Sequence, residues 1–315
     1  MKHLLNWLEY SSEELKRMIE LAQKFKEERR RGRRVYTFLE GKSVVLIFEK
    51  PSTRTKASLM IAVKELGGFP CSFTRDELQL SRGEPVKDTA RVLSRYFDSI
   101  IARVYRHEDL EIMAKYSLVP IVNALSDKFH PLQALADIQT IVEKKGRLKE
   151  LKIAFIGDGT DNVLNSLIIV SAKLGIHLSV ACPKQYSPSP QLLKLLKEDI
   201  SMSGACIEVV QDPVKAVKEA DVIYTDVFVS MGQEQEREKR LSVFLPKYQV
   251  NEKLTEYAKD DYIFMHCLPA HRGEEVTNAV IEDSKHSVVF DQAENRLHSA
   301  KAVLYYLLGE KHGDF

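Results

Sequence analysis

Short apolar segments rich in β-branched residues recur along this 315-residue chain, and segments with helical spacing lie between them. The apolar segments show no polar alternation, which is typical of strands covered on both faces in a parallel sheet. The helical segments sit between two such runs, as right-handed βαβ crossovers require. The pattern therefore predicts an α/β fold with parallel sheets, with strands at 43–48, 99–104, 119–123, 152–156, 177–181, 222–225, 262–265 and 287–290 and helices that include 166–174, 212–220 and 251–258.

A polar stretch from Glu143 to Lys149 divides this pattern into two parts. A chain of this length also suggests two domains, at roughly 150 residues per domain. We predict a first domain at residues 1–145 and a second at 150–290, each a parallel β-sheet flanked by helices. The last helix, within residues 293–315, is apolar on one face and is a candidate to pack back on the first domain.

A helix is also predicted near the N-terminus, because Ser11 and Glu14 form a capping-box pattern that precedes apolar residues at helical spacing. It should end near Arg30, with Gly32 as the stop. Basic residues are favoured at such a helix end, so the arginines around Gly32 are interpreted as a solvated terminus. A binding site for a polyanion is the alternative.

The charge balance of the chain excludes several classes of protein. The 46 Lys and Arg residues nearly equal the 45 Asp and Glu residues, which leaves a net charge of +1 and no broad basic surface for nucleic acid.

We see no apolar run of about 18 residues to span a membrane, and no secretory signal core. The four cysteines are scattered without a C-x-x-C pair, so reduced thiols and a cytoplasmic location are expected.

Two glycine turns resemble nucleotide-binding motifs without completing them. The segment 41–43 lacks the earlier glycine that a P-loop requires, since Tyr36 stands there. The turn at 157–159 follows a strand, but Asn162 occupies the third glycine position of the dinucleotide fingerprint. We predict no NAD(P) or other nucleotide cofactor. The turn still offers the polar side chains of Asp161 and Asn162 where open α/β sheets bind ligands.

The segment from Ser52 to Lys56 lies between a predicted strand and a predicted helix. Unpaired N–H groups at the positive end of a helix bind anions, and hydroxyl groups can add further donors. The guanidinium group of Arg54 can add a bidentate contact that a lysine would not reproduce. We interpret this segment as a phosphate cradle, with an ordinary capped helix and a surface arginine as the alternative.

Two more candidates of the first domain keep two interpretations each. His130 precedes Pro131, which suits the first position of a helix, so its imidazole could donate to a developing oxyanion or simply cap that helix. Arg103 closes a predicted strand and is either a substrate-binding arginine or an ion-pair partner.

Candidate groups of the second domain follow two predicted strands. Asp226 and Ser230 could hold an ammonium group, with the backbone amides near Met231 left for a carboxylate; an ordinary strand end is the alternative. The thiol of Cys267 could be a nucleophile, a proton acceptor, a metal ligand or a buried apolar group. Zinc is disfavoured, because His266 and Cys267 should point to opposite sides of an extended chain.

Taken in order, these motifs resemble the aspartate/ornithine carbamoyltransferase family over nearly the whole chain. The family's carbamoyl-phosphate motif is matched by Ser52-Thr53-Arg54-Thr55, its arginine by Arg103, and its H-P-x-Q motif by 130–133. The motifs typical of the ornithine branch are matched by Asp226 with 230–232, and by 266–269.

The resemblance implies an active site in the cleft between the two domains, with no metal or other cofactor. It implies transfer of the carbamoyl group of carbamoyl phosphate to the δ-amine of L-ornithine, which gives L-citrulline and phosphate in arginine metabolism. The carbamoyl-phosphate-binding residues that it implies are Ser52, Thr53, Arg54, Thr55, Gln79, Arg103, His130, Gln133, Cys267, Leu268 and Arg296. The ornithine-binding residues that it implies are Asn162, Asp226, Ser230 and Met231. Its catalytic residues correspond to Arg103, His130 and Cys267.

The resemblance also implies a homotrimer or a multiple of trimers, because family members lend the loop that contains Gln79 to a neighbouring subunit. Three positions depart from the family pattern: Lys56 replaces an arginine, Leu59-Met60 replaces Phe-Glu, and Asp161 replaces the first of two asparagines. Since Asn162 holds its matching position, we expect ornithine binding to persist.

Two alternative functions stay open from the sequence. One is a carbamoyltransferase that acts on putrescine or an acylated ornithine, although the 230–232 segment favours a free α-amino acid. The other is a catalytically silent subunit, which the presence of Arg54, His130 and Cys267 disfavours.

Overall fold

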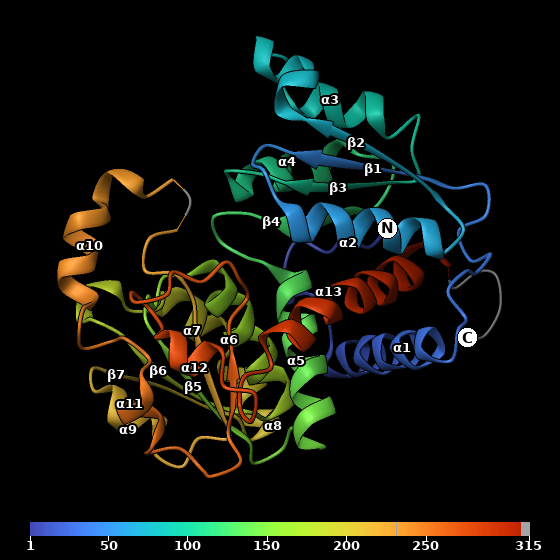
Figure 1. The fold of residues 1–315 in the computed structure, drawn as a ribbon. Coiled ribbons are helices and arrows are strands. Elements are labelled where there is room, and N and C mark those ends of the chain that lie inside the picture. Colours follow the sequence, from blue (N-terminus) through green and yellow to red (C-terminus); the bar gives the residue numbers. More distant parts are fainter. Residues whose placement is uncertain (231, 310–315) are drawn as a thin grey trace. The chain divides into compact units, whose positions relative to one another are not determined.

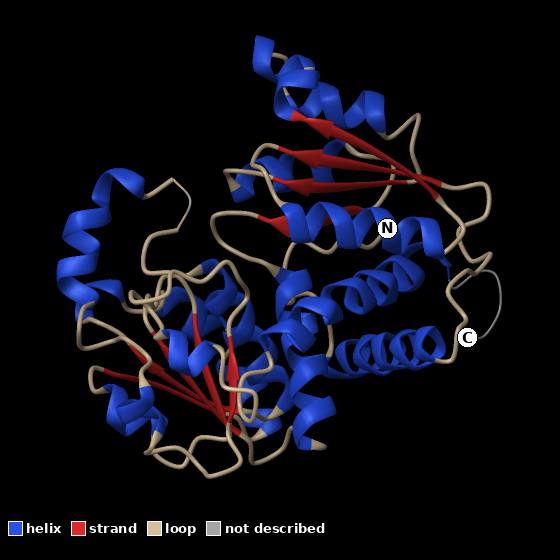
Figure 2. Ribbon diagram, viewed as in Figure 1, coloured by secondary structure: helices blue, strands red, loops and turns tan. Residues whose placement is uncertain are grey.

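The computed structural model describes residues 1–230 and 232–309. The chain divides into two compact units: unit 1 comprises Met1–Gln139 and the described residues from Glu294 onward, and unit 2 comprises Thr140–Ala293. Each unit contains one parallel sheet with helices around it (Figure 1). Figure 2 shows the strands of both sheets in red and their helices in blue. The predicted class, two α/β domains that are each built on a parallel sheet, is confirmed.

The sheet of unit 1 has the strand order β2-β1-β3-β4, and every pair in it is parallel. Its inner strands are apolar and buried, as expected for strands covered on both faces. The strands are β1 (Ser43–Phe48), β2 (Phe69–Thr74), β3 (Ser99–Arg103) and β4 (Ile121–Leu125). The helices are α1 (Ser12–Arg30), α2 (Thr53–Glu65), α3 (Val86–Leu93), α4 (His107–Tyr116), the first part of α5 (Pro131–Lys145) and most of α13 (Val289–Leu304), with short helices η1 (Arg75–Glu77), η2 (Gln79–Arg82) and η5 (Tyr305–Gly309).

The sheet of unit 2 has the order β7-β6-β5-β8-β9 and is also parallel throughout. Its strands are β5 (Lys152–Ile156), β6 (His177–Ala181), β7 (Cys206–Val210), β8 (Val222–Thr225) and β9 (Ile263–Met265). Its helices are α6 (Asn162–Leu174), α7 (Pro190–Leu195), α8 (Lys197–Ser203), α9 (Pro213–Val217), α10 (Arg237–Phe244), α11 (Glu252–Thr255) and α12 (Asn278–Ile281), with short helices η3 (Lys184–Tyr186) and η4 (Glu234–Glu236).

Each sheet contains a point at which the strand order reverses. In unit 1 the chain places β2 on one side of β1 and then β3 and β4 on the other, with Phe48 and Arg103 as register partners. In unit 2 it places β6 and β7 on one side of β5 and then β8 and β9 on the other, with Ile156 opposite Thr225. The loops that leave such neighbouring strands diverge, and open α/β sheets bind ligands there.

The sequence missed two strands and predicted one that does not form. Both missed strands, β2 and β7, are edge strands with largely exposed or half-buried residues, so they lack the apolar run of a covered strand. The strand predicted at 287–290 is wrong, because Ser287 forms only an isolated bridge with Phe264 and α13 begins at Val289.

The N-terminal helix forms as predicted. Ser11 and Glu14 make both hydrogen bonds of the capping box, and α1 ends at Arg30 before Gly32, which has a φ of 94°. Exposed ion pairs join Arg31 to Glu27 and Arg33 to Glu28, which fits a solvated helix end. Within the described ranges, no helix is long and apolar enough to cross a membrane.

Helix α13 is held in unit 1 by buried charges. In Figure 1 it lies beside α1, and Lys26 of α1 donates to Asn295 at 2.8 Å. The side chain of Lys301 is fully buried and forms an ion pair with Glu65 of α2, which also pairs with Arg29 of α1. One carboxylate therefore connects three helices that are distant in the sequence.

We predict that Glu65→Gln lowers the free energy of unfolding more than Lys301→Met does. The first change leaves a buried lysine without its anion, at a cost of about 3 kcal/mol, whereas the second leaves Glu65 paired with Arg29. Chemical denaturation measures both. The exposed pair of Arg31 supplies the control, since Arg31→Met should cost less than about 1 kcal/mol. Equal losses in all three variants would contradict this account of α13.

Candidate functional site

The N-terminus of α2 lies directly after β1, at the reversal point of unit 1. Helix α2 begins at Thr53, and Ser52 before it is extended, with a φ of −159°. In the described structure the Ser52 hydroxyl makes no capping hydrogen bond, although Ser52 holds the N-cap position. The Ser52 side chain therefore does not cap the first backbone N–H groups of the helix. N–H groups at a helix N-terminus have the geometry that favours an anion.

Three buried side chains from separate helices meet behind this N-terminus. The guanidinium group of Arg296 donates through Nη1 to Gln133 Oε1 at 2.6 Å and through Nη2 to Thr55 Oγ1 at 3.1 Å. Gln133 donates in turn to Asp137 at 2.8 Å, which fixes the direction of its amide. The structure thus brings together Thr55, Gln133 and Arg296, which the sequence separates by up to 241 residues.

His130 lies in the same unit, just before Pro131 begins α5. Burial, followed by the positive charges of Arg296 and Arg103, holds the pKa of the His130 imidazole well below its usual value. A neutral imidazole carries a single N–H, which can donate to a carbonyl oxygen without adding a full charge. Arg103 is buried at the end of β3. Two guanidinium groups and a neutral imidazole make this part of unit 1 suited to an anion with a carbonyl group.

The other predicted residues of unit 1 lie nearer to solvent. Arg54 is half-buried in the first turn of α2, and Thr53 is exposed. Gln79 is exposed at the start of η2. Of the departures from the family pattern, Lys56 lies 5.8 Å above the ring of Phe48.

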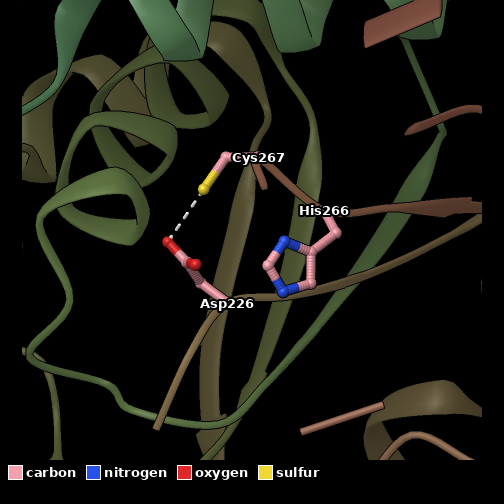
Figure 3. A group of neighbouring side chains, drawn as sticks. All are labelled: Asp226, His266 and Cys267. Atoms are coloured by element: carbon pink, nitrogen blue, oxygen red, sulfur yellow. Dashed lines mark hydrogen bonds between the residues drawn. The ribbon is translucent and has the colours of Figure 1, made fainter. Parts of the chain in front are cut away.

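The reversal point of unit 2 holds a thiol beside a carboxylate. Asp226 directly follows β8 and Cys267 lies two residues after β9. The Cys267 thiol donates to Asp226 Oδ2 at 3.1 Å, and Figure 3 shows the two groups pointing toward each other. Burial raises the pKa of the Asp226 carboxyl, while His266 and the thiol hydrogen bond counteract that rise. The pair can hold or accept a proton from an amine.

His266 lies close to this pair, which corrects an expectation from the sequence. One ligand atom from each of Asp226, His266 and Cys267 lies within 4.8 Å of the others, so His266 and Cys267 do not point apart as an extended chain would make them. The chain leaves the strand at Met265, and Leu268 adopts a φ of 60°.

The ring of His266 is held by two partners. Nδ1 accepts the Leu268 N–H at 2.9 Å, and Nε2 lies 3.1 Å from Glu275 Oε1. Since Nδ1 accepts, the ring proton is on Nε2 and donates to Glu275. A cation bound to the three ligand atoms through Nδ1 would have to displace the Leu268 N–H, and one bound through Nε2 would have to displace the bond to Glu275.

Asp161 and Asn162 open helix α6 beside the same edge of the sheet. Asp161 caps the helix, and its carboxylate accepts the N–H groups of Val163 at 2.8 Å and Leu164 at 2.9 Å. Burial, followed by repulsion from Asp226, raises the pKa of Asp161 well above its usual value. The departure at Asp161 therefore places a second buried carboxyl group near Asp226.

The segment after Asp226 differs from its prediction in one respect. The Ser230 N–H donates to Gln233 Oε1 at 3.0 Å, and the Gly232 N–H donates to the Glu234 carboxylate at 2.9 Å. On the sequence alone, the backbone amides near Met231 are left for a substrate carboxylate. For the neighbouring Gly232 amide that expectation is wrong, because the Glu234 carboxylate accepts its N–H. Met231 lies outside the described residues.

Two residues that orient side chains of the site were not predicted from the sequence. Asp137 fixes Gln133 from one helical turn away, and the i, i+4 spacing within a predicted helix was a usable signal for it. Glu275 fixes His266 from a loop, and no periodic pattern marks it.

Comparisons with known proteins match the two parts of the chain to two domain families. Residues 2–143 match the carbamoyl-phosphate-binding domain of aspartate/ornithine carbamoyltransferases, and residues 149–307 match the Asp/Orn-binding domain. The chain belongs to the aspartate/ornithine carbamoyltransferase family.

Within that family the chain is similar to ornithine carbamoyltransferases. It is 54% identical to the ornithine carbamoyltransferase of Hyperthermus butylicus, over 98% of this chain and 97% of that one. It is 53% identical to the anabolic ornithine carbamoyltransferase of Pyrococcus furiosus, over 98% and 96%. The solved structure of ornithine carbamoyltransferase from Pyrococcus furiosus superposes with a TM-score of 0.93 at 52% identity, covering 98% of this chain and 97% of that one.

We predict that Asp161→Asn stabilises the protein increasingly as the pH rises above about 4. A carboxyl with a raised pKa contributes stability that is complete below its unfolded pKa and is lost as the pH rises through its folded pKa. Asparagine keeps an oxygen to cap α6 but cannot ionise. Melting temperatures of the two proteins should coincide at low pH and diverge toward pH 8. The exposed Asp76→Asn change is the control, and a constant difference at every pH would refute the prediction.

Proposed function

We propose that this protein transfers the carbamoyl group of carbamoyl phosphate to the δ-amine of L-ornithine, which gives L-citrulline and phosphate. The observation that carries the proposal is the Cys267 thiol hydrogen-bonded to Asp226 at the reversal point of unit 2. It occurs in a chain whose other unit presents a helix N-terminus and buried guanidinium groups. The names of the relatives, which are ornithine carbamoyltransferases, support the same substrate pair.

Carbamoyl phosphate is proposed to bind unit 1 through its charged phosphate and its neutral carbonyl group. The phosphate takes the N–H groups at the start of α2, the hydroxyls of Ser52, Thr53 and Thr55, and the guanidinium of Arg54. The carbonyl oxygen lies toward Arg103, His130 and the Arg296–Gln133 pair. Because these donors are already buried and oriented, they stabilise the negative charge that grows on that oxygen during attack.

Ornithine is proposed to bind unit 2 through Asn162, Asp226, Ser230 and Met231. Buried carboxyl groups at Asp161 and Asp226 suit a substrate that brings ammonium groups. This inventory favours ornithine over N-acetylornithine, whose α-amine is neutralised, and over putrescine, which has no carboxylate for the Ser230 hydroxyl to bind.

The reaction follows from the chemistry of the two substrates. The δ-amine of ornithine attacks the carbamoyl carbon only after it has lost a proton, and the Asp226–Cys267 pair is the proposed acceptor. A C–N bond forms, the bond from that carbon to the phosphate oxygen breaks, and phosphate leaves with the electron pair into the α2 cradle, taking the second proton that the attacking nitrogen loses. Cys267 and Leu268 are proposed to contact the carbamoyl group.

We further propose a homotrimer, or a multiple of trimers, in which the exposed Gln79 serves a neighbouring subunit's site. The likeness to an anabolic relative favours a role in arginine biosynthesis. The proposed location is the cytoplasm, whose reducing conditions would keep the Cys267 thiol, which forms no disulfide, in the reduced state needed for proton transfer. No metal, nucleic acid or membrane enters the proposal.

The first test compares three amine substrates at saturating carbamoyl phosphate. We predict that citrulline formation from L-ornithine exceeds carbamoylation of putrescine and N-acetylornithine, because only ornithine has both a free α-ammonium and a carboxylate. Colorimetric detection of the ureido product measures all three. A higher kcat/KM with either other amine would contradict the assignment, and an absence of turnover with any of them would favour a silent subunit.

The second test concerns the phosphate cradle. Arg54→Lys should raise the KM for carbamoyl phosphate by about tenfold or more, since lysine loses the bidentate contact of the guanidinium. Lys64→Ala, an exposed change on the same helix, is the matched control and should leave that KM unchanged. Initial rates with carbamoyl phosphate varied at saturating ornithine give both values. A normal KM in the Arg54 variant would remove it from the phosphate site.

A further inference from the structure

We propose that Arg240 is a positioning residue for ornithine binding, because it forms hydrogen bonds to both segments that lead to the ornithine-binding residues. This inference rests on the proposed function of that site. Arg240 lies on α10, and no motif in the sequence singled it out. It is 2% exposed, which is exceptional for an arginine that faces no substrate in the proposal.

Two hydrogen bonds from one guanidinium connect three parts of unit 2. Arg240 Nε donates to the Phe228 carbonyl at 2.6 Å, and Nη2 forms an ion pair with the Asp158 carboxylate. Phe228 lies midway between Asp226 and Ser230 in the segment that follows β8. Asp158 lies in the turn that follows β5. The side chain therefore joins the two loops that diverge at the reversal point.

Packing fixes the plane of this guanidinium group. Its central carbon lies 4.6 Å from the ring centroid of Tyr186 and 5.6 Å from that of Phe244. Phe244 stacks on Phe228 with centroids 4.7 Å apart and an angle of 9° between the rings. A planar guanidinium can stack on aromatic rings and donate from its edge at once, which a lysine ammonium cannot do. The arrangement is thus specific to arginine.

The turn after β5 is fixed by further bonds. The second oxygen of Asp158 accepts the Thr160 N–H at 2.8 Å and the Thr160 hydroxyl at 2.7 Å. A side chain at Gly159 would meet the Tyr186 carbonyl oxygen at 2.3 Å, so this turn tolerates only glycine there. Helix α6, which begins at Asn162, follows directly. Moving Asp158 would therefore move the start of α6.

Arg240 also neutralises one of the three buried acidic groups at this edge of the sheet. Asp158 is 3% exposed, and Arg240 neutralises it. The Asp161 and Asp226 carboxyl groups are thereby left for the ammonium groups of the substrate. Without the guanidinium, Asp158 would add an uncompensated buried charge beside them. A residue that only stabilised the fold would not change the KM for ornithine alone.

The experiment compares Arg240→Lys with Arg237→Met, a change on the same helix at a half-exposed pair with Glu274. Both substrates are varied in initial-rate assays, and melting temperatures are recorded. Arg240→Lys keeps the positive charge but loses the planar guanidinium group that donates in two directions. The KM for ornithine should therefore rise about tenfold, which corresponds to one charge-assisted hydrogen bond. The KM for carbamoyl phosphate should stay within about twofold. Arg237→Met should resemble the unaltered protein.

A double variant separates charge from positioning. Arg240→Met with Asp158→Asn removes both buried charges, so its melting temperature should exceed that of Arg240→Met alone. The KM for ornithine should stay high in the double variant, because the Phe228 carbonyl still lacks its donor. Recovery of the ornithine KM together with the melting temperature would show a structural role only and would overturn the proposal.

Hydrogen exchange keeps this test independent of turnover. Amides of 157–162 and 226–230 should exchange faster in Arg240→Lys than in the unaltered protein, and those of unit 1 should not. Unchanged exchange in both segments would overturn the positioning role. A lack of citrulline formation by the unaltered protein would instead count against the proposed function, so the two failures are distinguishable.

Discussion

The reversal of strand order in each parallel sheet is the constraint on which the rest of the structure depends. Neighbouring parallel strands end at the same edge, and a reversal sends the two following loops in opposite directions. In unit 1 this places the start of α2 beside the end of β3, where Arg103 lies. In unit 2 it places the turn after β5 beside Asp226. In each unit the sheet therefore brings together loop segments that are separate in the sequence.

Burial gives these groups their chemical properties. In unit 1, burial and two neighbouring guanidinium groups lower the pKa of His130, so positive charge is already in place for an anion. In unit 2, burial raises the pKa of Asp161 and Asp226, and repulsion from Asp226 adds to the rise at Asp161. The neighbouring charges, positive around His130 and negative around Asp161, distinguish the two sites. The near-neutral net charge of the chain conceals this division.

The sequence predicted the parts of the fold whose physical signal is local. Covered strands such as β1 and β5 are continuous apolar runs, whereas the edge strands β2 and β7 are half-exposed and carry no such run. The capping box at Ser11 predicted α1 for the same local reason. The side chains that orient the candidate sites could not be found in this way. Glu275 reaches His266 from a loop that no periodic pattern marks, and Arg240 reaches Asp158 across 82 residues of sequence, so only the folded chain reveals these contacts.

Phosphate is proposed to bind to residues of unit 1, and the α-amino acid to residues of unit 2. Calorimetric titration of inorganic phosphate, and then of L-norvaline at saturating phosphate, tests it in Arg54→Lys and Asp226→Asn. The account predicts that Arg54→Lys weakens phosphate binding. Asp226→Asn should leave the Kd for phosphate unchanged and raise the Kd for norvaline, an α-amino acid without the reacting amine. Loss of phosphate affinity in Asp226→Asn, or normal affinity in Arg54→Lys, would contradict it.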